Sequence, residues 1–331
     1  MRRGDYAAAW AVNDAVLAGR TSPPDDPRLP YHLRHVWDGR PFDGRDVLVR
    51  CYHGLGDTLQ FLRYLPALRA RAAFVALEAQ PELVPLLRGM PGVDRLIPFD
   101  VAAPASPAGC DIESMELFHA LRLAPGFITI SYLPFSHAAP SPAALPRDDL
   151  SRNAGEVKPM HAPGPLHLSR SSRERSPRAS AAGEGLSIGL CAKAGDWDSE
   201  RSIPLPQLAA ALPAHARPVR LQRADADALD WANPGATLVD IMETATLVRA
   251  VDLVVTVDTM IAHLAGTLGR PVCLLLKKRA DWRWMDQGQG SPWYPSMRLY
   301  RQHRVGDWSA PLRELARDLS RLSPPACARA G

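Results

Sequence analysis

The chain has 331 residues, of which 46% are hydrophobic and 22% are charged. Both fractions lie near globular averages, so they exclude a disordered chain and a fibrous repeat, and the length suits two domains of roughly 150 residues each. No apolar run approaches the roughly 18 residues of a membrane-spanning helix, and the N-terminus lacks the apolar stretch of a signal peptide. We therefore expect a cytoplasmic protein without a transmembrane segment.

The charge and the cysteines narrow the class further. A net charge of +4 fits an anionic ligand, but the basic residues form no clustered stripe, so nucleic acid is not an expected partner. The five cysteines are widely spaced and form no Cys-x-x-Cys pair. We therefore expect neither a disulfide framework nor a zinc knuckle.

The first part of the chain predicts a helix and then alternating strands and helices. The small-residue spacing from Asp5 to Ala18 predicts an amphipathic helix, so residues 1–24 are assigned to an N-terminal helical segment that could be the remnant of a helical repeat. Strands at 47–49 and 74–77 then alternate with helices near 58–72 and 81–88. This order predicts a parallel sheet in a domain of residues 25–136.

A second series predicts strands at 186–190, 219–221, 237–239, 253–257 and 272–276. It defines a C-terminal domain of residues 185–309, followed by a helix and tail at 310–331. Residues 137–184 between the two series are rich in Pro, Ser and Arg and are interpreted as a linker. The predicted fold class is α/β, with two parallel sheets that face a central cleft, where ligands of such sheets bind.

A glycine loop separates the first predicted strand from its helix. Gly54 and Gly56 allow close backbone approach, and a helix start offers free N–H groups to an anion. A dinucleotide fingerprint would need a third glycine where Leu59 stands, so a nicotinamide site is discounted. From composition alone, the favoured interpretation of Asp57 in this loop is a helix cap.

Two segments of the second domain carry candidate ligand-binding groups. Asp258, Thr259 and Met260 open a helix after the most hydrophobic strand, where free N–H groups suit a pyrophosphate and Asp258 suits sugar hydroxyls. The alternative is that Asp258 or Thr259 caps the helix. In the loop after residue 192, Lys193 or Arg201 could neutralise a leaving phosphate, or the loop could simply be solvated.

Metal binding is not expected. Two Asp-x-Asp pairs, Asp196 with Asp198 and Asp225 with Asp227, occur about as often as chance predicts. Three tryptophans between residues 282 and 293 suit either stacking on sugars or a buried core, and these alternatives stay open.

Taken together, these segments resemble glycosyltransferase family 9, the heptosyltransferase-like group, and especially its members attached to tetratricopeptide repeats. The resemblance rests, in chain order, on Tyr31-His32 through Trp37-Asp38-Gly39, Gly54 through Tyr64, Arg201-Ser202-Ile203-Pro204, Val257 through Gly266, and Asp281-Trp282-Arg283-Trp284 with Ser291 through Pro295. It covers most of residues 31–310, apart from the linker.

The resemblance implies a GT-B fold with an N-terminal acceptor domain, a C-terminal domain for a nucleotide-diphosphate sugar, and no metal or other cofactor. It places Asp57 as the general base of an inverting transfer. It also implies that the C-terminal helix, Ala310 to Leu322, returns to the N-terminal domain.

For the donor, the resemblance maps Arg201 onto a phosphate-binding residue, and Asp258, Thr259 and Met260 onto the helix start that holds the sugar. The loop from Asp240, with Glu243 and Thr244, would contact the nucleotide ribose. Two features depart from the family pattern: Met260 replaces a small residue, and the run Lys277 to Arg279 replaces an apolar, proline-containing segment.

We therefore expect a glycosyltransferase whose partners are a nucleotide sugar and a glycan, lipid-linked or protein acceptor, with peripheral membrane contact left open. The alternative is a catalytically degenerate GT-B protein that binds a nucleotide sugar, or a protein partner, without turnover.

Overall fold

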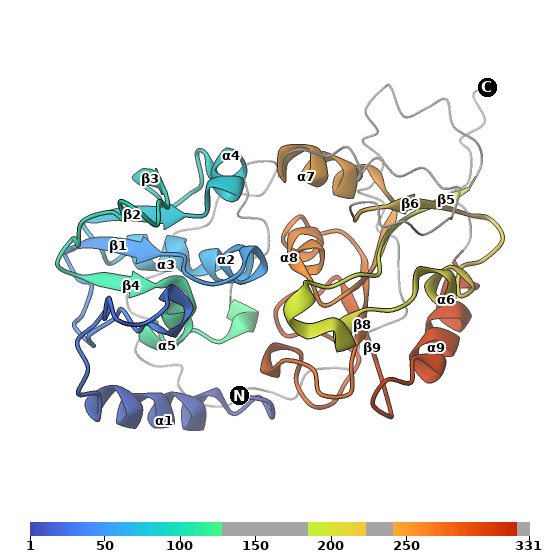
Figure 1. Cartoon of the computed structure of the whole chain (residues 1–331), viewed down its shortest axis with the longest axis horizontal. Coiled ribbons are helices and arrows are strands. Elements are labelled where there is room, and N and C mark those ends of the chain that lie inside the picture. The colour runs from blue at the N-terminus through green and yellow to red at the C-terminus, as the bar shows by residue number, and fades with distance from the viewer. Residues whose placement is uncertain (128–184, 223–240, 323–331) are drawn as a thin grey trace. The chain divides into compact units, whose positions relative to one another are not determined.

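The computed structural model describes residues 1–127, 185–222 and 241–322. The chain divides into two compact units, Met1–His161 and Ala162–Gly331, and each contains one parallel β-sheet (Figure 1). The expected linker, the expected strand at 237–239, the pair Asp225 and Asp227, and Asp240 lie outside the described residues. Within each unit the predicted α/β class is confirmed.

The first unit contains a four-stranded sheet in the order β3-β2-β1-β4. The strands are β1 (Asp46–Arg50), β2 (Phe74–Ala79), β3 (Arg95–Pro98) and β4 (Asp111–Glu113), and every pair is parallel. Central strand β1 is buried from its second residue onward. Such continuous burial is typical of a parallel strand that is covered on both faces.

The helix expected near residues 58–72 is broken into three segments. These are α2 (Leu55–Phe61), the 3-10 turn η2 (Leu62–Tyr64) and α3 (Leu65–Arg69). Pro66 has no amide hydrogen to bond a carbonyl one turn earlier, so a continuous α-helix cannot run through it undisturbed. Proline has a similar place at Pro81 and Pro85, where the turn η3 (Pro81–Leu83) leads into the short helix α4 (Val84–Leu87).

The remaining elements of the first unit include the predicted N-terminal helix, which is confirmed as α1 (Tyr6–Ala18). Asp5 caps it by accepting the Ala8 N–H at 3.0 Å. Its buried aromatic rings Tyr6 and Trp10 pack against Phe118 of α5 (Leu117–Ala120), with ring centroids 5.4 and 5.5 Å apart. The helix is thus part of this unit's core, and its relation to a helical repeat stays a prediction. Short 3-10 turns complete the unit at η1 (Tyr31–Leu33), η4 (Ser114–Glu116) and η5 (Pro125–Phe127).

The second unit contains a five-stranded parallel sheet in the order β6-β5-β7-β8-β9. Its strands are β5 (Leu186–Cys191), β6 (Ala216–Arg220), β7 (Leu253–Val257), β8 (Val272–Leu276) and β9 (Met297–Arg301). The described helical elements are η8 (Asp196–Arg201), α6 (Leu205–Ala209), α7 (Ile241–Ala250), α8 (Met260–Thr267), η10 (Trp282–Trp284) and α9 (Ser309–Leu319). Helices α7 and α8 contact each other.

The C-terminal helix α9 packs against the sheet of the second unit. Leu315 and Leu319 of α9 belong to the buried core that α6 and the strands of the second sheet also form (Figure 1). Tyr300 of β9 donates a hydrogen bond to Asp318 at 2.9 Å, and Arg298 pairs with the same carboxylate. The apolar stripe of α9 is thus covered by its own sheet, while the expected return of this helix to the N-terminal domain stays a prediction.

The tryptophan-rich segment near residues 282–295 is core. Trp284, Trp293 and Tyr294 are at most 1% exposed. The His263 ring stacks on Trp284, and its Nδ1 lies 3.0 Å from the Tyr294 hydroxyl, as expected for a satisfied core histidine. Gly266 is needed here, because a Cβ atom would lie 2.6 Å from Tyr294 Cδ1. The open choice for Trp284 and Trp293 is thus decided in favour of a buried core.

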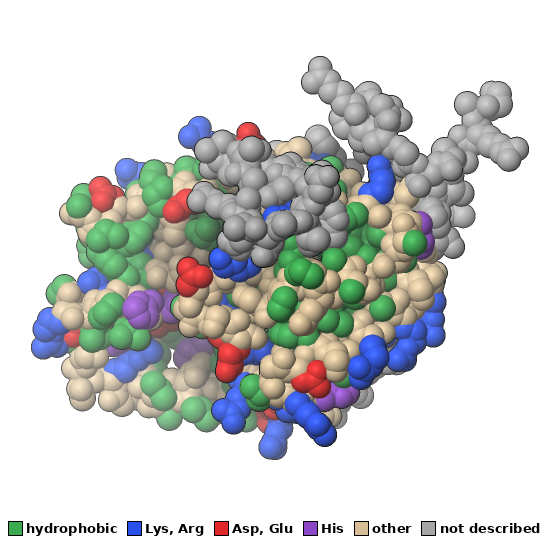
Figure 2. Space-filling model, turned by 45° about the vertical axis from the view of Figure 1, so that its right-hand side comes forward, with side chains coloured by type: hydrophobic (Ala, Val, Ile, Leu, Met, Phe, Trp, Pro, Cys, Tyr) green, Lys and Arg blue, Asp and Glu red, His purple; other side chains and the backbone are tan. Residues whose placement is uncertain are grey.

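The helices and the basic side chains of the described residues show two further properties. Among the described residues, every helix is too short or too polar to cross a bilayer. On the face drawn in Figure 2, the Lys and Arg side chains of the described residues lie scattered among other side chains and form no single stripe.

Candidate functional site

The glycine loop of the first unit connects the carboxyl end of β1 to α2. Gly54 is the N-cap residue of α2, and its N–H donates to Asp57 Oδ2 at 3.0 Å. The predicted capping contact of Asp57 therefore exists. Asp57 is half-buried, and Gly56 lies beside it in the first turn of α2. The structure thus brings Gly54, Gly56 and Asp57 together, while the catalytic role of Asp57 stays a prediction.

Side chains from the neighbouring strand hold this loop in place. Thr58 Oγ1 donates to Gln80 Oε1 at 3.0 Å, and Gln80 Nε2 donates to the His53 carbonyl at 2.7 Å. Gln80 directly follows β2, so these two bonds join the carboxyl ends of β1 and β2. They fix the backbone immediately before Gly54.

A buried carboxyl group that the sequence interpretation missed lies beside the loop. Glu113, the last residue of β4, is 2% exposed, and burial raises its pKa to about 8. Hydrogen bonds from Met115 N–H and the Ser114 hydroxyl oppose this shift in pKa, while the nearby charge of Asp57 adds to it. His53 Nε2 lies 4.0 Å from Glu113 Oε2. A carboxyl that holds its proton near neutral pH therefore sits next to the candidate base.

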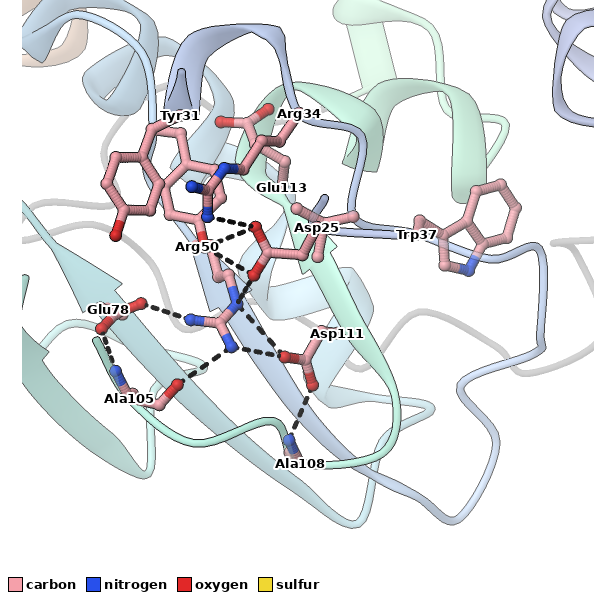
Figure 3. Close-up of polar contacts among 12 residues, drawn as sticks. Asp25, Tyr31, Arg34, Trp37, Arg50, Glu78, Ala105, Ala108, Asp111 and Glu113 are labelled. Carbon is pink, nitrogen blue, oxygen red and sulfur yellow. Dashed lines mark hydrogen bonds and ion pairs between the residues drawn. The ribbon is translucent and has the colours of Figure 1, made fainter. Parts of the chain in front are cut away.

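A buried ion-pair network anchors the end of β1 just before the glycine loop (Figure 3). The Arg50 side chain donates to Glu78 and to Asp111, each at 2.8 Å, and its Nε lies 3.8 Å from Asp25. Arg34 pairs with Asp25 at 3.2 Å. The network holds the N-terminal segment and the β3–β4 connection against the sheet. Removing one member would leave an uncompensated charge in a buried position.

In the second unit, the candidate donor residues follow β7 and open α8. Thr259 is the N-cap residue, and its hydroxyl accepts the Ile261 N–H at 3.2 Å. Met260 is the first helical residue and is half-buried. Burial raises the pKa of Asp258 to about 6, and the nearby Trp284 and Arg201 side chains act in the opposite direction. The carboxylate is therefore ionised in most molecules at pH 7 and accepts hydrogen bonds.

Arg201 lies beside this helix start. Its Nη1 donates to the Asp258 carbonyl at 2.8 Å, and its guanidinium stacks on Trp197, 4.0 Å from the ring centroid. Nε lies 3.5 Å from Asp198 Oδ2 and has no hydrogen-bond partner. The structure thus joins Arg201 and Asp258, which are 57 residues apart in the sequence.

The departure at Lys277 has a structural role. Lys277 Nζ, at the end of β8, lies 2.8 Å from Asp198 and 3.1 Å from Glu200. These ion pairs tie the loop that carries Arg201 to the carboxyl end of β8. They also occupy one carboxylate of the Asp196–Asp198 pair. Within the described part of the chain there is no cluster of three or more metal-ligating side chains.

The other predicted donor residues lie in the loop after β5 and in α7. Lys193 is exposed, and its backbone N–H donates to Gln222 Oε1 at 3.0 Å. Glu243 and Thr244 lie in the first part of α7, which packs against α8. All three residues belong to the second unit, and their roles stay predictions.

The fold of this chain is similar to that of solved glycosyltransferase structures. No protein-family model matches the sequence. The structure is similar to that of E. coli ADP-heptose lps heptosyltransferase II, with 16% identity, a TM-score of 0.52, and coverage of 83% of this chain and 97% of that one. The glycosyl transferase family 9 structure from Veillonella parvula DSM 2008 aligns with a TM-score of 0.47 at 12% identity, over 80% of this chain and 87% of that one.

Protein FlbA of Caulobacter vibrioides is a curated sequence relative. It is 24% identical over an alignment of 338 residues, which covers 95% of this chain. The chain spans about half of that relative, 52% of its length. The structural comparison shows that this chain has the GT-B, heptosyltransferase-like fold of glycosyltransferase family 9. The fold implied by the sequence motifs is thereby confirmed.

The shifted pKa of Glu113 predicts how stability depends on pH. The folded-state pKa of about 8 is above the ordinary glutamate value of 4.5. Between these values the folded state binds a proton that the unfolded state has lost, so the free energy of unfolding falls as pH rises, by at most about 1.4 kcal/mol per pH unit. Chemical denaturation at pH 5, 6.5 and 8 should show this fall in the wild type, and Glu113→Gln should remove it.

The matched control is Glu82→Gln, which changes an exposed glutamate of the same unit. It should keep the wild-type pH dependence. If Glu113→Gln and Glu82→Gln follow the same curve as the wild type, Glu113 does not hold a proton in the folded state.

Proposed function

We propose that this protein is an inverting, metal-independent glycosyltransferase that moves a hexosyl or heptosyl group from a nucleotide-diphosphate sugar to an acceptor hydroxyl. The observation that carries the proposal is the bond from Arg201 to the Asp258 carbonyl, because it places a guanidinium at the start of α8. In a GT-B fold this position is suited to a ligand, because ligands of open parallel sheets bind at the carboxyl ends of the strands.

On the donor side, three groups of the second unit have complementary roles. The start of α8 offers backbone N–H groups and the positive end of the helix dipole to the diphosphate. Arg201 adds a permanent positive charge that stabilises the diphosphate as it leaves. Asp258 accepts hydrogen bonds from sugar hydroxyls, and Met260 narrows the space beside them. Lys193, Glu243 and Thr244 are proposed to contact the outer phosphate and the ribose.

On the acceptor side, Asp57 is proposed as the general base. Its carboxylate takes the proton of the acceptor hydroxyl while the acceptor oxygen bonds to the anomeric carbon from the face opposite the leaving group. The bond from the anomeric carbon to the diphosphate oxygen breaks, and the diphosphate keeps that electron pair. Glu113 keeps the neighbouring position neutral when protonated, so that Asp57 bears the charge.

The solved heptosyltransferase structures include E. coli WaaC bound to ADP. A nucleoside diphosphate is therefore a reasonable first probe for this chain. The acceptor is proposed to be a glycan, a lipid-linked glycan or a protein. The enzyme is proposed to act in the cytoplasm, either free or in peripheral contact with a membrane.

The second candidate is a protein that binds a nucleotide sugar without turnover. It is favoured by one observation: one oxygen of the Asp57 carboxylate already accepts the Gly54 N–H as a helix cap. Saturable nucleotide binding without transfer to any acceptor hydroxyl would favour this candidate over the enzyme.

Asp57→Asn tests the base directly. The asparagine oxygen can still accept the Gly54 N–H, so the loop should keep its structure, but the amide cannot take a proton. We expect kcat to fall by about 10² to 10⁴-fold with an unchanged Kd for the donor nucleotide. Asp46→Asn, at an exposed position at the start of β1, is the control and should behave as wild type. Near-normal turnover of Asp57→Asn would restrict Asp57 to capping.

Arg201→Ala tests phosphate recognition. Loss of a charged hydrogen bond should weaken nucleoside diphosphate binding by about 1.5 to 3 kcal/mol, and Arg201→Lys should recover part of it, since lysine lacks the planar fork. Lys278→Ala, an exposed change next to Lys277, should leave the affinity unchanged. Calorimetry that gives equal affinities for Arg201→Ala and wild type would assign the phosphates to another group.

Metal independence is tested by transfer in excess EDTA. A guanidinium and a helix start can stabilise a leaving diphosphate, so activity should persist under chelation. A metal-dependent transferase would lose activity, because its cation neutralises the leaving group. Activity that disappears with EDTA and returns with Mg²⁺ or Mn²⁺ would contradict this part of the proposal and point to the Asp-x-Asp pairs.

A further inference from the structure

Among the described residues of the second unit, Trp197 is the most exposed large hydrophobic side chain. It is 81% exposed, whereas Trp284 and Trp293 are almost fully buried. Trp197 lies in the turn η8, on the loop that leaves the carboxyl end of β5. Single apolar side chains are often exposed on protein surfaces, so exposure alone assigns no role to Trp197. Its contact with Arg201, the candidate phosphate-binding residue, is what points to a ligand at this ring.

The indole is exposed but held in place. One face carries the Arg201 guanidinium, 4.0 Å from the ring centroid. The ring edge lies over Gly195, where a Cβ atom would be only 3.2 Å from Trp197 Cδ1. A residue larger than glycine would require the indole to shift by a few tenths of an ångström. Arg201 is in turn bonded to the Asp258 carbonyl, so the ring has a defined place relative to the start of α8.

The two faces of the indole differ in what they contact. The guanidinium covers one face, and the high exposure of the side chain means that solvent reaches the other. An aromatic face is well suited to a flat π-system, and stacking on aromatic side chains tolerates any nucleobase. A pyranose ring can also lay its C–H groups against an indole face, so the probes must separate the base from the sugar.

We propose that the solvent-exposed face of Trp197 is the stacking platform for the base of a nucleoside diphosphate whose phosphates bind Arg201. This inference rests on the proposed donor site. Arg201 and Trp197 then act as one unit, in which the guanidinium binds the phosphates and the indole that it covers binds the base. The platform recognises the nucleoside part of the donor, while the start of α8 and Asp258 recognise the diphosphate and the sugar.

Calorimetric titration of the full chain separates stacking from phosphate binding. The probes are ADP, an ADP-sugar, UDP and inorganic pyrophosphate. The proteins are wild type, Trp197→Ala, Trp197→Phe and the control Val305→Ala, which changes an exposed apolar residue of the same unit. Trp197→Ala should weaken ADP binding about five- to a hundredfold, with pyrophosphate binding changed less than twofold. Trp197→Phe should restore most of the affinity, and Val305→Ala should match wild type.

Fluorescence gives a second measurement that a structural role would not reproduce. Saturating ADP should quench part of the wild-type tryptophan emission, because a stacked base lies against Trp197, and this component should be missing in Trp197→Phe. Pyrophosphate should not cause the same quenching.

Three results would overturn the inference. Equal losses for ADP and pyrophosphate would mean that Trp197 only positions Arg201. Unchanged ADP affinity in Trp197→Ala would mean that no base stacks there. A loss of affinity for an ADP-sugar but not for ADP would place the sugar on the ring. If wild type binds none of the nucleoside diphosphates, the proposed donor site itself is wrong, which is a separate outcome.

Discussion

The hydrogen bond from Arg201 to the Asp258 carbonyl is the contact on which the candidate donor site depends. It joins the loop after β5 to the start of α8, two segments that the parallel sheet brings to the same edge but does not itself connect. Trp197 stacks on this arginine, and Lys277 fixes Asp198 beside it. The guanidinium thus links this loop, which also has hydrogen bonds of its own, to the position where a diphosphate is proposed to bind.

The first unit uses charge in a different way. Its network around Arg50 is buried and has three carboxylate partners, so it fixes backbone segments and has no free capacity for a ligand (Figure 3). Next to this network, Gln80 holds the glycine loop by a hydrogen bond to the His53 carbonyl. Glu113 lies near enough to Asp57 for the charge of Asp57 to raise its pKa. The anchored end of β1 therefore presents Asp57 on a rigid support. Such support is what a proton-transfer group needs, because its reach is limited to hydrogen-bond distance.

Much of this arrangement follows from local sequence patterns. The apolar runs that became β1, β5, β7 and β8 predict parallel strands, and in such sheets the loops at their carboxyl ends carry ligand-binding groups. The positions of Asp57, Arg201 and Asp258 at such loops could therefore be predicted. The break at Pro66 was also readable, because proline removes a helical hydrogen bond, but the expected helix ran through it.

Other features depend on long-range contacts that a pattern does not specify. Nothing local distinguishes Trp197, which is exposed, from Trp284, which is buried, because the difference lies in which element covers each ring. Glu113 follows only two strand residues, so its burial comes from the sheet and the turns around it. The packing of α9 against its own sheet depends on contacts with β9, such as the hydrogen bond from Tyr300 to Asp318. An acidic residue at the end of a strand is the signal that would have directed attention to Glu113.

The most direct measurement for the account is hydrogen–deuterium exchange of the wild-type chain with and without saturating nucleotide-diphosphate sugars. Exchange reports the opening of individual backbone hydrogen bonds, and a bound ligand slows it where contacts form. The account predicts protection concentrated in residues 193–202 and 258–263, with little change in the strands of either unit. Protection confined to other segments, or no protection with any nucleotide sugar at concentrations well above typical donor affinities, would contradict it.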